Sequence, residues 1–325
     1  MGAAAAVLAF GFDASFQFGD FVVRWQTIGL AVAVFAGIAW SALIAGRTPV
    51  FEAAVQEPQG EASAGEPDAG PAGHMRRDDL LFIILGALPG AVILGRLGYG
   101  LLHADWYARD WQQLLDPAGG SMELTGAVVG GTLTGIYVAA LLDAAVGRWL
   151  HVAIRPLLLA LALGKAAEVL DGGGQGALVL DGHGLATAYA GSGPWGSPGA
   201  DLPAIPAQLL EAAMATAVLV VVALLGWRSG LRRADGRLFA VGLAAWALGR
   251  AAVASTWRDA SVLGSLNAEQ LICLTVAAVT AGAALVATVV IRRRRVRDDR
   301  NSHNQNRDDQ RGGGAVPEPE PVAPG

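Results

Sequence analysis

Seven stretches of the chain are long enough and apolar enough to cross a lipid bilayer as helices. A transmembrane helix needs about 20 consecutive, mainly apolar residues. Stretches of this kind occur at 21–46, 79–103, 124–146, 150–170, 207–227, 237–257 and 269–291. Hydrophobic residues make up 53% of the 325 and charged residues only 16%, which is outside the usual range of soluble proteins. The sequence therefore predicts an all-α, polytopic membrane protein with about seven transmembrane helices.

The distribution of arginines between the spans predicts which way the chain crosses the membrane. Short loops rich in Lys and Arg stay on the cytoplasmic side. Alternate loops and the tail carry the arginines Arg47, Arg76, Arg77, Arg148, Arg155, Arg228, Arg232, Arg233, Arg237, Arg292, Arg293, Arg294, Arg295 and Arg297. The intervening loops hold only Arg109 and Arg258. We therefore expect the amino terminus outside and the carboxyl terminus in the cytoplasm.

Composition also separates the spans from polar segments. Residues 48–78 are rich in Glu, Ala, Gly and Pro, and residues 298–325 in Asn, Asp, Gly and Pro, so neither can bury a core. We expect an N-terminal segment with span one (1–47), a disordered cytoplasmic loop (48–78), a six-span membrane core (79–291) and a cytoplasmic tail (292–325) that is first basic and then disordered. The outer loop 172–206, with Tyr189 and Trp195, is expected to form a lid or substrate platform, because so long a loop is usually functional or disordered.

Charge and cysteine content exclude several kinds of function. The net charge of −5 does not suit binding to nucleic acid. Cys273 is the only cysteine, so the chain can form no internal disulfide and no cysteine-based metal or redox site. We expect no cofactor, no metal and no nucleic-acid partner.

Three charged residues follow the apolar run 156–164 within the same predicted helix or just after it. Lys165, the only lysine in the chain, directly follows this run and precedes Glu168 and Asp171. Spacings of three and six residues keep the three side chains within a narrow sector of a helix, so the amine and at least one carboxylate can meet. Two interpretations stay open. The helix end is simply solvated, because charged side chains snorkel to the surface, or the group forms a polar site just inside the bilayer.

Further charged residues lie in other spans, on the same side of the membrane as Lys165 by the predicted orientation. They are Arg24, Arg96, Glu211 and Arg250. An arginine near the bilayer centre costs about 2.5–3.5 kcal/mol on the lenient insertion scale, so these cations need partners. One interpretation makes Glu168 and Glu211 internal counterions. The other places the phosphate of an anionic lipid against the arginines, because the guanidinium fork matches phosphate oxygens.

Glycines on span three add a packing signal. Gly126, Gly130, Gly131 and Gly135 recur at short spacing within GAVVGGTLTG. Small residues let a neighbouring helix or an acyl chain approach closely. Ordinary helix packing is the simpler explanation for these glycines taken alone.

Six segments carry short motifs that are informative through their order and spacing. They are FVVRWQTIGL, GRLGYGLLHADWY, GGSMELTGAVVGG, GKAAEVLDGGGQG, GPWG with IPAQLLEA, and WALGRAAVASTWRD with LNAEQLICL. In this order they resemble IRWYGL, GARLGY, GG-(M/L)-S-F-H-G-G-L-I-G, GRIGNFxNGExxG, HPTQLYEA, and YxxxRFxxExxR with the final glutamine-containing span of the prolipoprotein diacylglyceryl transferase family. The resemblance covers nearly the whole chain apart from the segments expected to be disordered.

The resemblance is incomplete at polar positions of these motifs. The residues that match are Arg24, Arg96, Gln208, Glu211 and Arg250. In the first and third spans, Gln26 replaces a tyrosine of the family motif and Thr125 replaces a histidine. In the GKAAEVLDGGGQG segment, Lys165 replaces an arginine, and Glu168 and Asp171 replace two asparagines. In span six, Trp246 replaces a tyrosine and Ala254 replaces a glutamate. Fold and topology therefore carry over directly, whereas the changed residues fall at positions of catalytic importance.

The family consists of seven-span bacterial enzymes that move the diacylglyceryl group of phosphatidylglycerol to the lipobox cysteine of prolipoproteins. The resemblance implies a multi-pass protein of the bacterial plasma (inner) membrane. The implied partners are phosphatidylglycerol, the lipobox segment of a prolipoprotein and membrane lipids. The implied catalytic residues are Arg250, Lys165 and Glu168, and the implied substrate-binding residues are Arg96, Arg24, Thr125, Gln208, Glu211 and Trp246. Since the family's histidine is absent, Glu168 or His103 is the expected base for the substrate thiol, whose free pKa is about 8.5.

Two functions remain open at this stage. The first is an active, divergent transferase, which Arg250 and Arg96 favour. The second is a non-catalytic relative that binds anionic lipid or a lipoprotein precursor through the same groove. The pair Lys165 and Glu168 favours the second, because the carboxylate can neutralise the lysine and repel phosphate. A transporter or a retinal-type protein is not supported, since span seven has no lysine for a Schiff base and the spans show no internal repeat.

Overall fold

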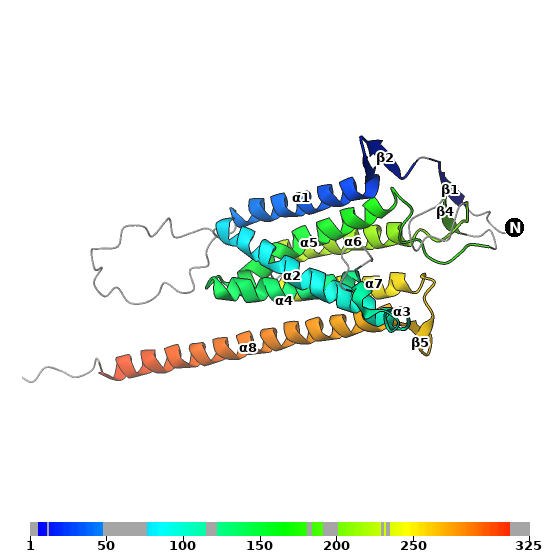
Figure 1. The fold of residues 1–325 in the computed structure, drawn as a ribbon. Coiled ribbons are helices and arrows are strands. Elements are labelled where there is room, and N and C mark those ends of the chain that lie inside the picture. The colour runs from blue at the N-terminus through cyan, green and yellow to red at the C-terminus, as the bar shows by residue number, and fades with distance from the viewer. Residues whose placement is uncertain are drawn as a thin grey trace, which may run out of the picture. The chain divides into compact units, whose positions relative to one another are not determined.

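A computed structural model describes residues 6–11, 13–47, 77–114, 122–180, 184–190, 201–228, 231 and 235–312. Within these ranges, seven helices are long and apolar enough to cross a membrane. They are α1 (Trp25–Ala45), α2 (Arg77–Leu102), α4 (Leu124–Leu141), α5 (Val146–Glu168), α6 (Ala207–Arg228), α7 (Arg237–Ala254) and α8 (Ala268–Gly312) (Figure 1). Each coincides with a predicted span, which confirms the all-α, polytopic membrane fold.

The chain forms two compact units, residues 1–281 and residues 282–325. The first contains the helices from α1 to α7 and the start of α8, and the second contains the rest of α8, which continues to Gly312. Residues 298–312 are therefore helical, although their composition predicted disorder. Three arginines and two glutamines in this stretch favour a helix, whereas its four aspartates and three asparagines do not, so composition alone does not explain why the helix continues. The predicted loop 48–78 lies outside the described residues, except for its last two, which begin α2.

Glycines bring α2 and α4 into close contact. A Cβ atom added to Gly130 would overlap the carbonyl oxygen of Gly90, and one added to Gly126 would lie 2.5 Å from that of Leu94. Neither position can hold a larger residue without moving the helices apart. Small residues serve this purpose in membranes because lipid supplies no hydrophobic force between helices. The predicted close helix approach is thus confirmed for Gly126 and Gly130.

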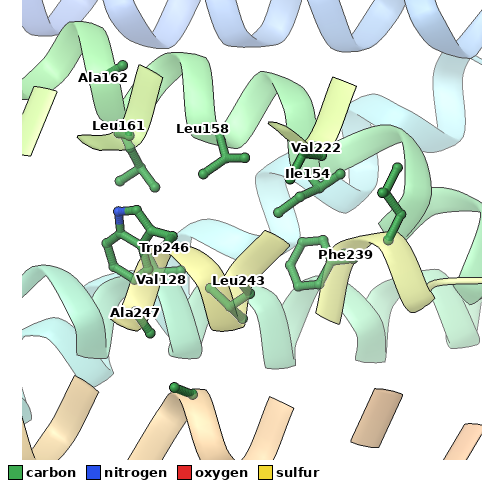
Figure 2. Packing of buried hydrophobic residues seen from close by; sticks show 13 residues of the cluster. Val128, Ile154, Leu158, Leu161, Ala162, Val222, Phe239, Leu243, Trp246 and Ala247 are labelled. Carbon is green, nitrogen blue, oxygen red and sulfur yellow. The ribbon is translucent and has the colours of Figure 1, made fainter. Parts of the chain in front are cut away.

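The helices α5, α6 and α7 share a hydrophobic core within the first unit. Its buried side chains include Ile154, Leu158, Leu161, Val222, Phe239, Leu243 and Trp246. Figure 2 shows the indole of Trp246 beside Leu161 and Val128. This packing fixes α7 against α5 and α6, and it therefore positions Arg250, which lies one turn beyond Trp246 on α7.

Short strands lie near the end of the helices at which α5 terminates (Figure 1). They are β1 (Ala6–Phe10), β2 (Ser15–Phe18), β3 (Phe21–Arg24), β4 (Leu185–Tyr189), β5 (Ser261–Leu263) and β6 (Leu266–Asn267). Strand β1 pairs with β4 in parallel, whereas β2 with β3 and β5 with β6 pair antiparallel. The short helices α3 (Ala104–Tyr107) and η1 (Trp111–Leu114) follow α2. None of these strands was predicted.

The outer loop 172–206 is partly built into this strand layer. Residues 185–189 form β4, and Thr187 of that strand also bridges to Ala204. Tyr189 is buried and its ring stacks on Phe10 of β1, with 4.9 Å between ring centroids. Trp195 lies outside the described residues. A role of this loop as a lid or substrate platform stays a prediction.

Candidate functional site

Arg250 and Lys165 are joined by a single carboxylate oxygen. Glu211 of α6 places its Oε2 atom 2.6 Å from Nη1 of Arg250 on α7 and 3.2 Å from Nζ of Lys165 on α5. Only 4% of the side chain of Arg250, and 4% of that of Glu211, is exposed. Lys165 Nζ also lies 3.0 Å from each carboxylate oxygen of Glu168, as the spacing of three residues predicted. The structure thus brings together four predicted site residues from three helices.

A second carboxylate faces the other side of the arginine. The Nε atom of Arg250 donates to Oε1 of Glu269 at 2.8 Å and to Oγ1 of Thr125 at 3.1 Å. The Thr125 hydroxyl donates to the same Glu269 oxygen at 2.8 Å. Cys273, one turn along α8, places its Sγ atom 3.5 Å from that oxygen. Thr125 therefore lies within the site, where a hydroxyl can orient its neighbours but is too weakly basic to take a thiol proton.

Glu123 adds a further carboxylate at the start of α4. Its side chain accepts hydrogen bonds from the backbone N–H groups of Thr125 and Gly126, and so caps the helix. Its Oε1 atom lies 4.0 Å from Nη2 of Arg250. Gly98 of α2 leaves room for this side chain, because a Cβ atom there would lie 3.2 Å from Oε2.

Sequence reasoning missed Glu123 and Glu269 as members of this site. Each lies at the start of a span, where a carboxylate is usually solvated or caps the helix. The one available signal was that both lie inside segments that resemble family motifs, GGSMELTGAVVGG and LNAEQLICL. With Glu168 and Glu211 they place four carboxylates around two cations.

Two tryptophans flank the Arg250 guanidinium. Its Cζ atom lies 4.9 Å from the ring centroid of Trp257 and 5.9 Å from that of Trp246. An arginine within about 6 Å of an indole face gains cation–π attraction. Trp246, expected from the resemblance to bind substrate, is buried in the hydrophobic core and contributes to the site through this contact.

The turn after α5 depends on a glycine of the GGG run. Gly174 has φ of +71°, in the left-handed region that side chains other than glycine rarely adopt. A Cβ atom there would lie only 2.5 Å from Oε2 of Glu168. Glycine is therefore required at position 174 for two reasons: the backbone conformation, and the space taken by the Glu168 carboxylate that binds Lys165.

Gln208 lies in a neighbouring polar group that joins α6 to strand β4. Its Nε2 atom donates to the hydroxyl of Tyr189 at 3.4 Å, and that hydroxyl donates to the carbonyl of Val169 at 2.9 Å. Asp171 accepts from the N–H of Gly173 at 3.0 Å. Within the part of the chain that the structure covers, Oε1 of Gln208 and Oδ2 of Asp171 are buried without hydrogen-bond partners. This group thus contains two buried acceptors that no described donor satisfies.

Burial shifts the acid–base properties of this polar group. Removal from water raises the pKa of Tyr189 to about 12, so the phenol stays protonated. Burial likewise raises the pKa of Asp171 above the ordinary value of 3.8, and the N–H of Gly173 and the charge of Arg24 oppose the shift.

Three other sequence candidates occupy different positions. Arg24 is exposed at the end of β3, directly before α1, and its charge acts on Asp171. Arg96 is partly buried on α2. His103 stacks on Tyr99 and shares a 3.0 Å hydrogen bond between its Nδ1 atom and the Tyr99 carbonyl. No contact of His103 with the Arg250 cluster is present among the described residues.

An apolar cavity of about 480 Å³ extends between α1, α2, α4 and α5. Its small lining residues include Gly37, Ala91, Gly131, Gly135 and Ala160, and none of the described residues that line it is charged. One end reaches Leu124, which is bonded in sequence to both Glu123 and Thr125 of the ionic site. The volume is within the range of about 300–1,000 Å³ that is typical of ligand pockets.

In the described ranges, no group of three or more His, Cys, Asp or Glu side chains is placed to hold a metal ion. The carboxylates instead face arginine and lysine.

Seven spans, with a buried arginine–lysine–carboxylate site beside an apolar cavity, define a multi-pass helical membrane protein with an internal ionic site. The chain belongs to the prolipoprotein diacylglyceryl transferase family, a family of transferases, because the sequence model of that family matches residues 13–288. This confirms the resemblance drawn from the motifs.

Two named relatives support the assignment at low identity. The chain is 24% identical over 200 residues to the phosphatidylglycerol–prolipoprotein diacylglyceryl transferase of Clostridioides difficile, covering 62% of this chain and 75% of that protein. It is 25% identical over 275 residues to the enzyme of the same name from Trichormus variabilis, covering 82% of this chain and 86% of that protein. The chain is therefore a divergent member of the family.

Proposed function

We propose that this protein transfers the diacylglyceryl group of phosphatidylglycerol to the lipobox cysteine of prolipoproteins in the plasma membrane of a bacterium. The observation that carries the proposal is the convergence of Arg250 and Lys165 on one oxygen of Glu211. Family membership and the names of the two relatives support the same reaction.

The phosphate of the lipid binds between the two cations. In the free protein the Glu211 carboxylate oxygen occupies the point that both Arg250 Nη1 and Lys165 Nζ reach. A phosphate oxygen at this point replaces the carboxylate as shared acceptor, and the guanidinium supplies further donors in a fork. Charge that develops on the departing glycerol phosphate is then stabilised in a site closed to water.

The acyl chains occupy the apolar cavity between α1, α2, α4 and α5. The cavity ends at Leu124, beside Thr125 and Glu123, so a lipid whose phosphate is at Arg250 can extend its chains along α4. Gly131 and Gly135 line the cavity, which supports an acyl chain beside span three, the alternative to helix packing for these two glycines.

The chemical step is a displacement at carbon. The lipobox thiol gives up its proton, its sulfur forms a bond to the glyceryl carbon, and the carbon–oxygen bond to the phosphate breaks. The electron pair leaves with glycerol phosphate, and a thioether results. Positioning and charge stabilisation are the contributions of the protein.

Two carboxylates are candidates for the base. Glu168 was expected in this role, but both of its oxygens bind Lys165 Nζ in the free protein, so it becomes available when phosphate takes the lysine. Glu269 accepts a hydrogen bond from the hydroxyl of Thr125, the residue at the family's histidine position. Comparing Glu168→Gln with Glu269→Gln at rising pH separates them, because the variant that lacks the base regains rate as the thiol ionises without help.

Complementation tests the function directly. The chain is expressed in bacteria whose own diacylglyceryl transferase can be shut off, and the mass of a reporter prolipoprotein is followed. We expect a reporter heavier by one diacylglyceryl group, with no such product from Arg250→Ala. A control variant, Arg47→Gln, removes an exposed arginine at the end of α1 and should leave the product unchanged. Correctly inserted wild-type protein that yields no modified reporter would contradict the proposal and indicate a non-catalytic lipid-binding member.

A further inference from the structure

Two basic side chains lie on α5 far from the ionic site. Arg155 is ten residues before Lys165 in the same helix, which places it about 15 Å away along the helix axis. His151 lies one turn before Arg155, so the two share a face of α5. Neither belongs to the site described above, and no family motif contains them.

The Arg155 guanidinium rests in a space made by a glycine. A Cβ atom on Gly226 of α6 would lie 2.6 Å from Nη2 of Arg155 and 3.2 Å from a methyl carbon of Leu238 on α7. The guanidinium therefore lies where α5, α6 and α7 meet. Its Nε atom is buried and has no hydrogen-bond partner among the described residues, and no ion pair to Arg155 occurs among them.

The side chain of His151 also lacks a described hydrogen-bond partner at one of its ring nitrogens. Only 7% of the residue is exposed, and its buried Nδ1 atom has no partner in the part of the chain described. The carboxylate that acts on it is Asp235, whose backbone packs against Gly147 at the start of α5. Asp235 is already bound to Arg237, with 2.7 Å between Oδ2 and Nε. No described carboxylate therefore forms an ion pair with Arg155 or His151.

The position of Arg155 indicates which acceptor is missing. Gly226 and Leu238 lie near the end of α6 and the start of α7, so the guanidinium lies near the ends of these two candidate spans, although Arg155 itself is nine residues inside α5. Lipid phosphates lie at this level, and arginine presents a planar fork of donors that matches phosphate oxygens. We propose that Arg155, assisted by His151, binds the phosphate of an anionic lipid at the end of the helices opposite to Arg250. This site is independent of the transfer reaction.

Lipid counting tests the site. The full-length protein is purified in detergent, stripped of lipid and titrated with phosphatidylglycerol, with phosphatidylcholine or with inorganic phosphate, and bound molecules are counted by native mass spectrometry. We expect Arg155→Gln to hold one phosphatidylglycerol fewer than wild type, and Arg155→Lys to recover part of the loss. The matched variant Arg47→Gln removes an exposed arginine and should bind as wild type does.

A second variant guards against a fold defect. Gly226→Ala should cause the same loss as Arg155→Gln, because its Cβ atom takes the space of Nη2. Both variants should modify the reporter prolipoprotein as wild type does, which separates this site from the transferase site. An unchanged phosphatidylglycerol count in Arg155→Gln would overturn the proposal. So would binding of inorganic phosphate that is lost in Arg155→Gln while the lipid count stays constant, since the ligand would then be a soluble phosphate.

Discussion

Arg250 donates from Nε to the Oε1 atom of Glu269 across 2.8 Å, and both side chains are buried. This bond ties α7 to the start of α8 inside the first compact unit. The same guanidinium binds Glu211 of α6 and Thr125 of α4, so one side chain connects four helices. The site is consequently a part of what holds the bundle together.

Replacing Arg250 should therefore affect folding as well as activity. Removing one partner of a buried ion pair typically costs about 3–5 kcal/mol, because the remaining charge is buried alone. We expect Arg250→Ala to lower the melting temperature in detergent and to abolish transfer. Arg250→Lys keeps a positive charge near Glu211, so it should recover stability more than activity. Equal recovery of both would contradict a specific need for the guanidinium fork.

Lys165 offers a test of phosphate recognition. Lys165→Gln removes the charge, and we expect transfer to fall by about tenfold or more, as for loss of a hydrogen bond to a charged group. Lys165→Arg restores the residue of the family motif and a bidentate grip, so it should transfer at least as fast as wild type. Initial rates of reporter modification in membranes measure both. A Lys165→Gln variant as active as wild type would remove the lysine from the mechanism.

Asp171 should make stability depend on pH. Burial raises the pKa of its carboxyl in the folded state above the ordinary value of 3.8, so the folded state binds the proton more tightly than the unfolded state does. This carboxyl therefore destabilises the fold progressively as the pH rises from 3.8 through its raised pKa. Asp171→Asn should remove this loss and be more stable than wild type at neutral pH.

Melting temperatures across this pH range check the prediction for Asp171. The exposed Asp20 supplies a control, since Asp20→Asn should leave the pH dependence as it is. An Asp171→Asn variant with the wild-type pH dependence would show that burial of the Asp171 carboxylate does not destabilise the fold.

The glycine after α5 can be tested with a matched partner. Gly174→Ala places a residue in the left-handed region, which costs about 1–2 kcal/mol, and displaces the Glu168 carboxylate. Gly264, in the turn between β5 and β6, has φ of +59° with no atom within 4 Å of an added Cβ. We expect Gly264→Ala to lose similar stability but keep transfer activity, and Gly174→Ala to lose both. If Gly174→Ala and Gly264→Ala were equally active, the position of the Glu168 carboxylate would not matter for catalysis.

Filling the cavity should weaken lipid binding selectively. Ala91→Phe introduces a ring into the cavity between α2 and α4. A displaced acyl chain returns to lipid, so the hydrophobic cost is small and the loss comes from shape-dependent dispersion contacts. We expect a raised KM for phosphatidylglycerol with kcat nearly unchanged. Leu248→Phe, on a side chain exposed on α7, should leave KM as it is.

The sequence was sufficient for features that depend on neighbours along the chain. Apolar length predicts the seven spans, and the spacing of three residues predicts the contact between Lys165 and Glu168. Glu269 was not predictable in this way, because its partner Thr125 lies 144 residues earlier and only helix packing brings them together. The burial of Trp246 in the hydrophobic core was also not predictable, because a motif position does not show which way a side chain faces.

The pairing of β1 with β4 sets an order of events during synthesis. Phe10 leaves the ribosome long before its partner Tyr189, and the spans α1, α2, α4 and α5 are made between them. Strand β1 must therefore wait for β4, so this pair forms only after four helices have been inserted. A nascent chain arrested before residue 185 should lack the pairing and expose its amino-terminal residues to protease.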